Sequence, residues 1–99
     1  MPLHIDRSQP RLLKVRFTID PVDPEGPVSV VGSFNDWVPG LDELMPDGHA
    51  MRSVTIGLPY GERLVFRYLA GGNVWFDEPD ADLISPEGSI LLPVSPLLA

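Results

Sequence analysis

The chain has 99 residues, a formal net charge of −7, 12 prolines, 9 glycines and no cysteine. This length fits one domain with one modest core, and a chain without cysteine forms neither disulfides nor thiolate metal sites, which suits a reducing cytoplasm. The negative charge argues against nucleic acid and anionic membranes as partners, and no stretch predicts a signal peptide or a membrane span.

The first predicted strand covers residues 12–20, where apolar and polar side chains alternate. The apolar set is Leu13, Val15, Phe17 and Ile19. Alternation with a period of two is typical of a strand that buries one face. We therefore expect residues 1–10 to form an N-terminal tail and residues 11–99 to form a single domain. Residues 28–31, a β-branched run after a proline-rich loop, predict a second, buried strand.

Two further strands are predicted in the middle of the chain, after a loop rich in proline and glycine. Residues 51–58 set Val54, Ile56 and Leu58 on one face. Residues 63–70 alternate again, with Leu64, Phe66 and Tyr68 on one face and Arg63, Val65, Arg67 and Leu69 on the other.

A hairpin is predicted next, because Gly71 and Gly72 suit the positive φ angles of a tight turn. Residues 73–76 then pair antiparallel with the preceding strand, which brings Trp75 near Arg67. Residues 77–89 are predicted as an acidic loop and residues 90–94 as a last strand. Short strands between proline and glycine loops, with no amphipathic helix, predict an all-β protein: an immunoglobulin-like β-sandwich of short antiparallel strands.

Four stretches carry a resemblance to a known family: "VSVVGSFNDW", "LPYGERLVFRYLAGG", "VWFDEPDAD" and "SPEGSILLPV". In this order they resemble an early-set domain of carbohydrate-binding module family 48. That family includes the glycogen-binding domain of AMP-activated protein kinase β subunits and the N-terminal domains of isoamylases and branching enzymes. The resemblance covers about the last four fifths of the chain. Its most specific element is the pairing of G-S-F-N-x-W with a later W-x-x-x-P-D-A.

The resemblance implies a carbohydrate-binding site of five residues. Trp37 and Trp75 correspond to tryptophans that stack on glucose rings, and Arg67 stands where the glycogen-binding members have a lysine that bonds sugar hydroxyls. Ser89 and Leu91 stand where those members have a threonine and an asparagine. Serine keeps a hydroxyl, but leucine cannot bond a sugar. One residue also appears inserted in "AGGNVW", before the second tryptophan.

Physical chemistry supports a similar site and leaves alternatives open. An indole packs its flat face on the C–H face of a glucose ring and fixes only two torsions on binding. Either tryptophan could instead plug an end of the sandwich. We therefore expect a non-catalytic module that binds an α-glucan weakly. The alternative is a scaffold without sugar binding whose exposed apolar edge docks a protein partner or a second copy, through residues such as Val65, Leu69 and Leu91.

Catalytic and metal sites are not predicted, and neither is a cofactor. An acidic cluster lies at Asp77, Glu78, Asp80 and Asp82. It lacks the central glycine and distal glutamate of a calcium loop, and we expect it to be solvated. Glycoside hydrolysis needs two carboxylates facing each other across a cleft, which a small sandwich with short loops does not offer. His4 and His49 have no neighbouring ligand set and are expected at the surface.

Overall fold

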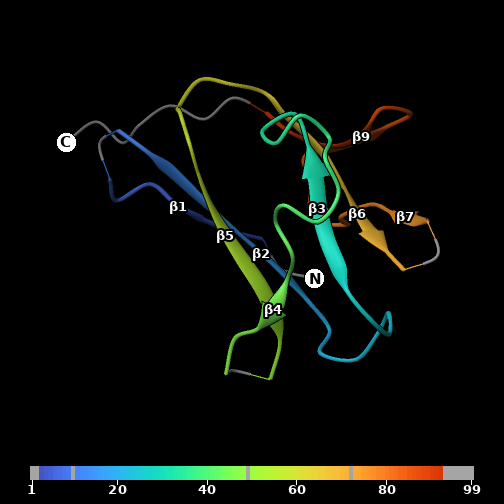
Figure 1. The fold of residues 1–99 in the computed structure, drawn as a ribbon. Helices are drawn as coiled ribbons and strands as arrows, with labels where there is room; N and C mark the ends of the chain where they lie inside the picture. Colours follow the sequence, from blue (N-terminus) through green and yellow to red (C-terminus); the bar gives the residue numbers. More distant parts are fainter. Residues whose placement is uncertain (1–2, 10, 49, 72, 93–99) are drawn as a thin grey trace.

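The computed structural model describes residues 3–9, 11–48, 50–71 and 73–92, and these form only strands, turns and loops (Figure 1). The strands are β1 (Leu3–Asp6), β2 (Leu13–Ile19), β3 (Val28–Gly32), β4 (Met45–Pro46), β5 (Arg52–Leu58), β6 (Leu64–Ala70), β7 (Val74–Phe76), β8 (Leu83–Ser85) and β9 (Gly88–Leu91). The predicted all-β class is confirmed. Within the described ranges there is no helix of the length and apolarity needed to cross a membrane.

The strands build two antiparallel sheets that pack as a β-sandwich. The first sheet has the order β1-β2-β5-β4, and the second has the order β3-β6-β9-β8. The short strand β7 also pairs with β6, so that β3 and β7 lie on opposite sides of β6 (Figure 1). Strand β6 is therefore the centre of the second sheet.

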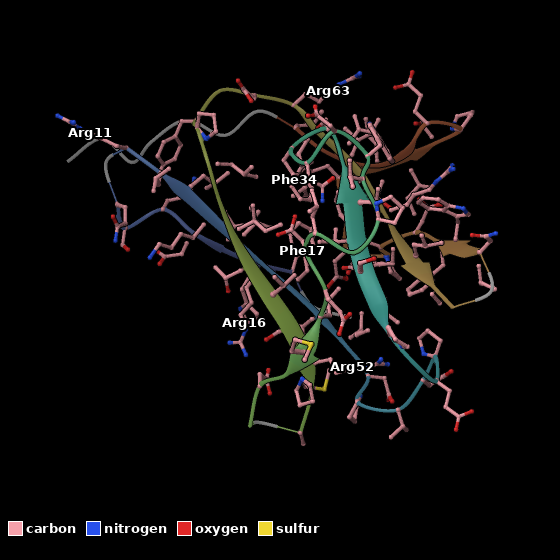
Figure 2. The ribbon with its side chains drawn as sticks, in the orientation of Figure 1. Arg11, Arg16, Phe17, Phe34, Arg52 and Arg63 are labelled. Carbon is pink, nitrogen blue, oxygen red and sulfur yellow. The ribbon has the colours of Figure 1, made fainter. Side chains whose placement is uncertain are left out.

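The core lies between the sheets and is built by the predicted alternation. Its buried members are Leu13, Val15, Phe17, Ile19, Val28, Val30, Leu44, Leu64, Phe66, Tyr68, Ala70 and Leu91. Phe17 of the first sheet meets Phe66 of the second edge to face, with ring centroids 5.0 Å apart. The ring of Phe34 stacks on Phe17 at 6.0 Å, and both lie between the sheets in Figure 2. Burial of these aromatic rings holds the two layers together.

The structure corrects the expected tail and adds strands that alternation did not predict. Within residues 1–10, Leu3–Asp6 forms β1, which pairs with β2 at the edge of the first sheet. Strand β4 lies in the expected proline- and glycine-rich loop before residues 51–58, and β8 lies in the expected acidic loop. These strands are two to four residues long and mostly exposed, so they have no buried face that a periodic pattern could reveal.

The hairpin between β6 and β7 forms as predicted, but its turn uses a different residue. Asn73 takes the left-handed conformation with φ 59°, whereas Gly71 has no positive φ. Asparagine tolerates this region because its short side chain can bond the local backbone. Gly72 and His49 lie outside the described residues, as do positions 93–94 of the expected last strand, whereas His4 is exposed on β1.

Candidate functional site

The turn after β3 is fixed by the side chain of Asn35. Its Oδ1 accepts the Gly32 backbone N–H over 2.9 Å, and its Nδ2 donates to the Val30 carbonyl over 3.0 Å and to Oδ2 of Asp42 over 2.9 Å. The Val30 N–H in turn donates to the Asp42 carbonyl. The side-chain amide of Asn35 thus connects Val30 and Gly32 of β3 with Asp42 in the loop that follows, which explains why an asparagine stands at this position.

Trp37 closes this turn and faces solvent. Asp36 and Trp37 both adopt left-handed backbone, with φ 56° and 59°, and the Trp37 N–H donates to the Gly32 carbonyl over 3.0 Å. Left-handed backbone is uncommon for a bulky residue and persists only where the surroundings impose it. The side chain remains 40% exposed. The expectation that this tryptophan could plug the sandwich is therefore wrong.

Gly32 lets the turn pass directly against β6. A Cβ at this position would lie 2.4 Å from the Val65 carbonyl oxygen and 2.8 Å from the Phe66 Cβ. The Ser33 N–H donates to that same carbonyl over 2.9 Å. The glycine is needed for this close approach of two backbones rather than for an unusual φ.

Trp75 and Arg67 share the outer face of the second sheet. Trp75 pairs with Leu69 across β6 and β7, and Arg67 lies two residues before Leu69 on the same face. Trp75 is 45% exposed, so it too does not plug the core. The loop after the Trp37 turn reaches this face as well, because the Gly40 N–H donates to Oγ of Ser29 over 3.3 Å, and Ser29 pairs with Leu69.

The two exposed indoles therefore flank β6. Trp75 comes from β7 on one side of that strand, and Trp37 comes from the turn that leaves β3 on the other side (Figure 1). Arg67 stands between these two edges, opposite Val31 of β3. Its Nη2 donates to the Pro86 carbonyl over 2.8 Å, and its Nε donates to Oδ1 of Asp77 over 3.4 Å.

Ser89 and Leu91 do not reach this face, which corrects their predicted place in an exposed site. Leu91 pairs with Leu64 and belongs to the core between the sheets. Ser89 is fully buried, and its Oγ accepts the Glu78 N–H over 2.8 Å and donates to Oδ1 of Asp77 over 2.9 Å. Because side chains alternate along β9, residues 89 and 91 turn inward together.

The expected apolar docking edge is also wrong for two of its three residues. Leu91 lies in the core, and Val65 is buried on the outer face, where it pairs with Ile90. Leu69 is half-buried. Exposed apolar side chains of the second sheet lie instead at Val74, Trp75, Leu83 and Ile84.

The acidic loop holds a buried carboxylate that the sequence did not reveal. Glu78 is fully buried, and its Oε1 accepts the Tyr68 hydroxyl over 2.7 Å while its Oε2 accepts the Asp80 N–H over 2.8 Å. Burial raises the pKa of Glu78, and these two hydrogen bonds act in the opposite direction. Burial and the neighbouring Glu78 carboxylate also raise the pKa of Tyr68. The expectation that this cluster is simply solvated is wrong for Glu78.

The acidic loop does not gather its carboxylates around one point. Asp82 accepts the Leu92 N–H over 2.9 Å, whereas Asp77 bonds Ser89 and Arg67. Among the described residues no group of three or more histidine, aspartate and glutamate side chains could hold a metal ion. The carboxylates of Asp77, Glu78 and Asp82 instead accept hydrogen bonds from protein donors, which ties the loop to the second sheet.

A cavity of about 320 Å³ opens at one end of the sandwich. Its walls are mostly apolar side chains such as Leu13, Leu58 and Leu64, and Glu62 is the one carboxylate among the described residues that line it. A pair of facing carboxylates, which glycoside hydrolysis needs, is not present in that lining.

In comparisons with known proteins, no protein-family model and no curated protein matches the chain.

Proposed function

We propose that the protein is a non-catalytic module that binds an α-glucan chain on the outer face of its second sheet. The observation that carries this proposal is the presence of two exposed tryptophans on elements at either side of β6, the strand that carries Arg67. Exposing an indole sacrifices the free energy that its burial would contribute, and large aromatic side chains at a surface are typical of contact sites. The resemblance to carbohydrate-binding module family 48, with its early-set, immunoglobulin-like fold, supports the same proposal.

The chemistry of the three side chains suits a neutral sugar. Each indole offers a flat apolar face to the C–H groups of a glucose ring, and a guanidinium donates to hydroxyl oxygens. Arg67 is half-buried, with two of its nitrogens bonded to protein oxygens, so it loses little side-chain freedom on binding. Since Ser89 and Leu91 are buried, they bond no sugar in this arrangement. We therefore expect weak binding, and we propose the reducing cytoplasm as its location because the chain has no cysteine.

Retention on a glycogen gel tests the proposal. Trp37→Ala and Trp75→Ala should each lose retention while the melting temperature stays within a few degrees, because an exposed platform contributes little to stability. Met45→Ala is the matched control, since it removes an exposed apolar side chain from the first sheet. Retention that survives both tryptophan substitutions would exclude this site.

A second function, docking of a protein partner or a second copy, is favoured by one observation. Val74, Leu83 and Ile84 are exposed on the short strands β7 and β8, and β8 is the last strand of its sheet. Apolar side chains on an edge strand are typical of surfaces that pair with another chain. In sedimentation experiments, self-association that Leu83→Lys abolishes would support this second function.

A further inference from the structure

We propose that Asp77 positions Arg67 and offsets its charge, so that the proposed sugar site selects a neutral glucan over an anionic one. This inference rests on the proposed function. It begins from the contacts of the Asp77 carboxylate, which the sequence placed in a solvated loop. Its Oδ1 lies 3.4 Å from Nε of Arg67 and accepts the Ser89 hydroxyl over 2.9 Å.

The carboxylate is itself held from the core side. The Ser89 hydroxyl that donates to Asp77 also accepts the Glu78 backbone N–H over 2.8 Å. Ser89 is fully buried, whereas the Asp77 and Arg67 side chains keep about a third of their surface, 29% and 31%. The chain of contacts therefore runs from the buried serine, through the aspartate, to the guanidinium on the outer face. Ser89 acts on the site through Asp77 rather than by touching a ligand.

The second contact of Arg67 fixes its direction. Its Nη2 donates to the Pro86 carbonyl over 2.8 Å, in the turn between β8 and β9. With Nε directed at Asp77 and Nη2 at Pro86, the plane of the guanidinium is defined by two acceptors. A donor group held in this way keeps its geometry when a ligand binds, which reduces the entropy lost on binding.

The same carboxylate changes which ligand the guanidinium prefers. An unpaired arginine attracts phosphate and carboxylate groups through charge-assisted hydrogen bonds. Asp77 offsets this attraction at close range, and the net charge of −7 adds a weaker repulsion of anions. Hydroxyl groups carry no charge and are not repelled. Asp77 is thus a positioning and specificity-determining residue for a neutral polyol.

The test compares two sugars on the wild-type protein and on Asp77→Asn by calorimetry. The probes are maltoheptaose and maltoheptaose that carries one 6-phosphate. The wild type should bind the neutral sugar more tightly, and Asp77→Asn should shift the ratio of the two affinities toward the phosphorylated sugar by about fivefold. Glu25→Gln changes the net charge equally in an exposed loop and should shift the ratio far less than Asp77→Asn does. An unchanged ratio in Asp77→Asn would overturn the selectivity.

A second variant covers the case in which Asp77→Asn fails to fold. Arg67→Gln removes the guanidinium and leaves the Asp77 charge without it. Both sugars should then bind less tightly, and the phosphorylated one should lose more. Because loss of a guanidinium weakens phosphate binding with or without Asp77, the wild type itself decides the selectivity in this case: if it bound the phosphorylated sugar as tightly as the neutral one, the selectivity would be overturned.

A measurement without sugar separates this inference from the proposed function. In the NMR spectrum, the Nε–H proton of Arg67 should exchange with water more slowly than that of the exposed Arg11, and Asp77→Asn but not Glu25→Gln should accelerate it. If the wild type binds neither sugar, the proposed function and the selectivity both fail, and slow exchange alone would still support the positioning. If maltoheptaose binds but the exchange rate of Arg67 is the same in Asp77→Asn, the positioning is wrong and the proposed function stands.

Discussion

The substitution Tyr68→Phe tests whether a buried carboxylate holds the loop that follows β7. The Tyr68 hydroxyl donates to Oε1 of Glu78 over 2.7 Å, and both side chains are fully buried. The Asp80 N–H donates to the other oxygen, Oε2, over 2.8 Å. Phenylalanine fills the space of the tyrosine ring, so the substitution removes one donor and leaves the packing of the ring in place.

The size of the effect follows from the charge of the acceptor. Hydrogen bonds to charged groups contribute about 1.5–3 kcal/mol, and Tyr68→Phe should lower the free energy of unfolding by that amount at pH values where Glu78 is ionised. Burial raises the folded-state pKa of Glu78 above 4.5, so the ionised carboxylate costs stability, and that cost disappears as the pH falls through the folded-state pKa toward 4.5. Losing the tyrosine donor raises the folded-state pKa further. The loss of stability in the variant should therefore become smaller as the pH falls from the folded-state pKa of Glu78 in the variant to that in the wild type, where the carboxylate takes up its proton.

Urea denaturation at a series of pH values measures this deficit directly. Tyr60→Phe is the matched control, because the Tyr60 hydroxyl donates over 2.8 Å to the uncharged backbone carbonyl of Gln9 at the surface. The control should cost less than Tyr68→Phe and should show no pH dependence. If the two variants lost the same free energy at every pH, the buried bond to Glu78 would not hold the loop.

Four further substitutions test the packing. Phe66→Ala should lower the free energy of unfolding by about 3–5 kcal/mol in chemical denaturation, because it opens a core cavity, whereas Arg67→Ala on the outer face should lower it by about 1 kcal/mol or less. Equal losses would show that the buried and exposed faces of β6 are assigned wrongly. Gly32→Ala should cost about 1–3 kcal/mol, because its Cβ would lie 2.4 Å from the Val65 carbonyl oxygen, and an unchanged melting temperature would contradict that close approach. Leu91→Asn should lower the melting temperature and should not strengthen glucan binding, because it buries an amide in the core. Stronger glucan binding would instead show that position 91 lies in the sugar site.

The sequence predicted the long strands well, and the physical reason is the period of their side chains. Strands β2 and β6 have seven residues each, which is enough for the alternation to define a buried face. The hairpin after residues 63–70 predicted that Trp75 comes near Arg67, and the structure places Trp75 opposite Leu69, two residues from Arg67. Strand β1 has four residues with mostly exposed side chains, and its existence depends on pairing with β2. No local pattern contains that information.

Two parts of the site required the three-dimensional structure. In β9, Ile90 and Leu91 are adjacent and both apolar, so the sequence alone does not reveal which of them faces the core. The structure buries Leu91 in the core and turns Ile90 to the outer face beside Val65. Glu78 lies in a run of acidic residues typical of a solvated loop, and only its contact with Tyr68, ten residues earlier, shows that it is buried.

The burial of Arg52 is likewise not predictable from the sequence pattern. It is a buried charged residue whose guanidinium donates to three backbone carbonyls of the loop before β3, at Asp20, Pro24 and Gly26. In the sequence it is an arginine at the start of a strand, which most often lies at the surface. Its burial follows from the path of a loop about thirty residues earlier, which alternation does not describe.

The measurement that tests the central proposal most directly is a tryptophan-fluorescence titration of the wild-type protein with maltoheptaose. Both tryptophans of the chain are exposed and lie in the proposed site, so a bound glucose ring must change their environment. The proposal predicts a saturable change with maltoheptaose. Calorimetry, which does not depend on indole fluorescence, should show no binding when Trp37 and Trp75 are both replaced by alanine. A fluorescence signal that stays flat or drifts linearly up to the solubility limit of the sugar would contradict the proposal.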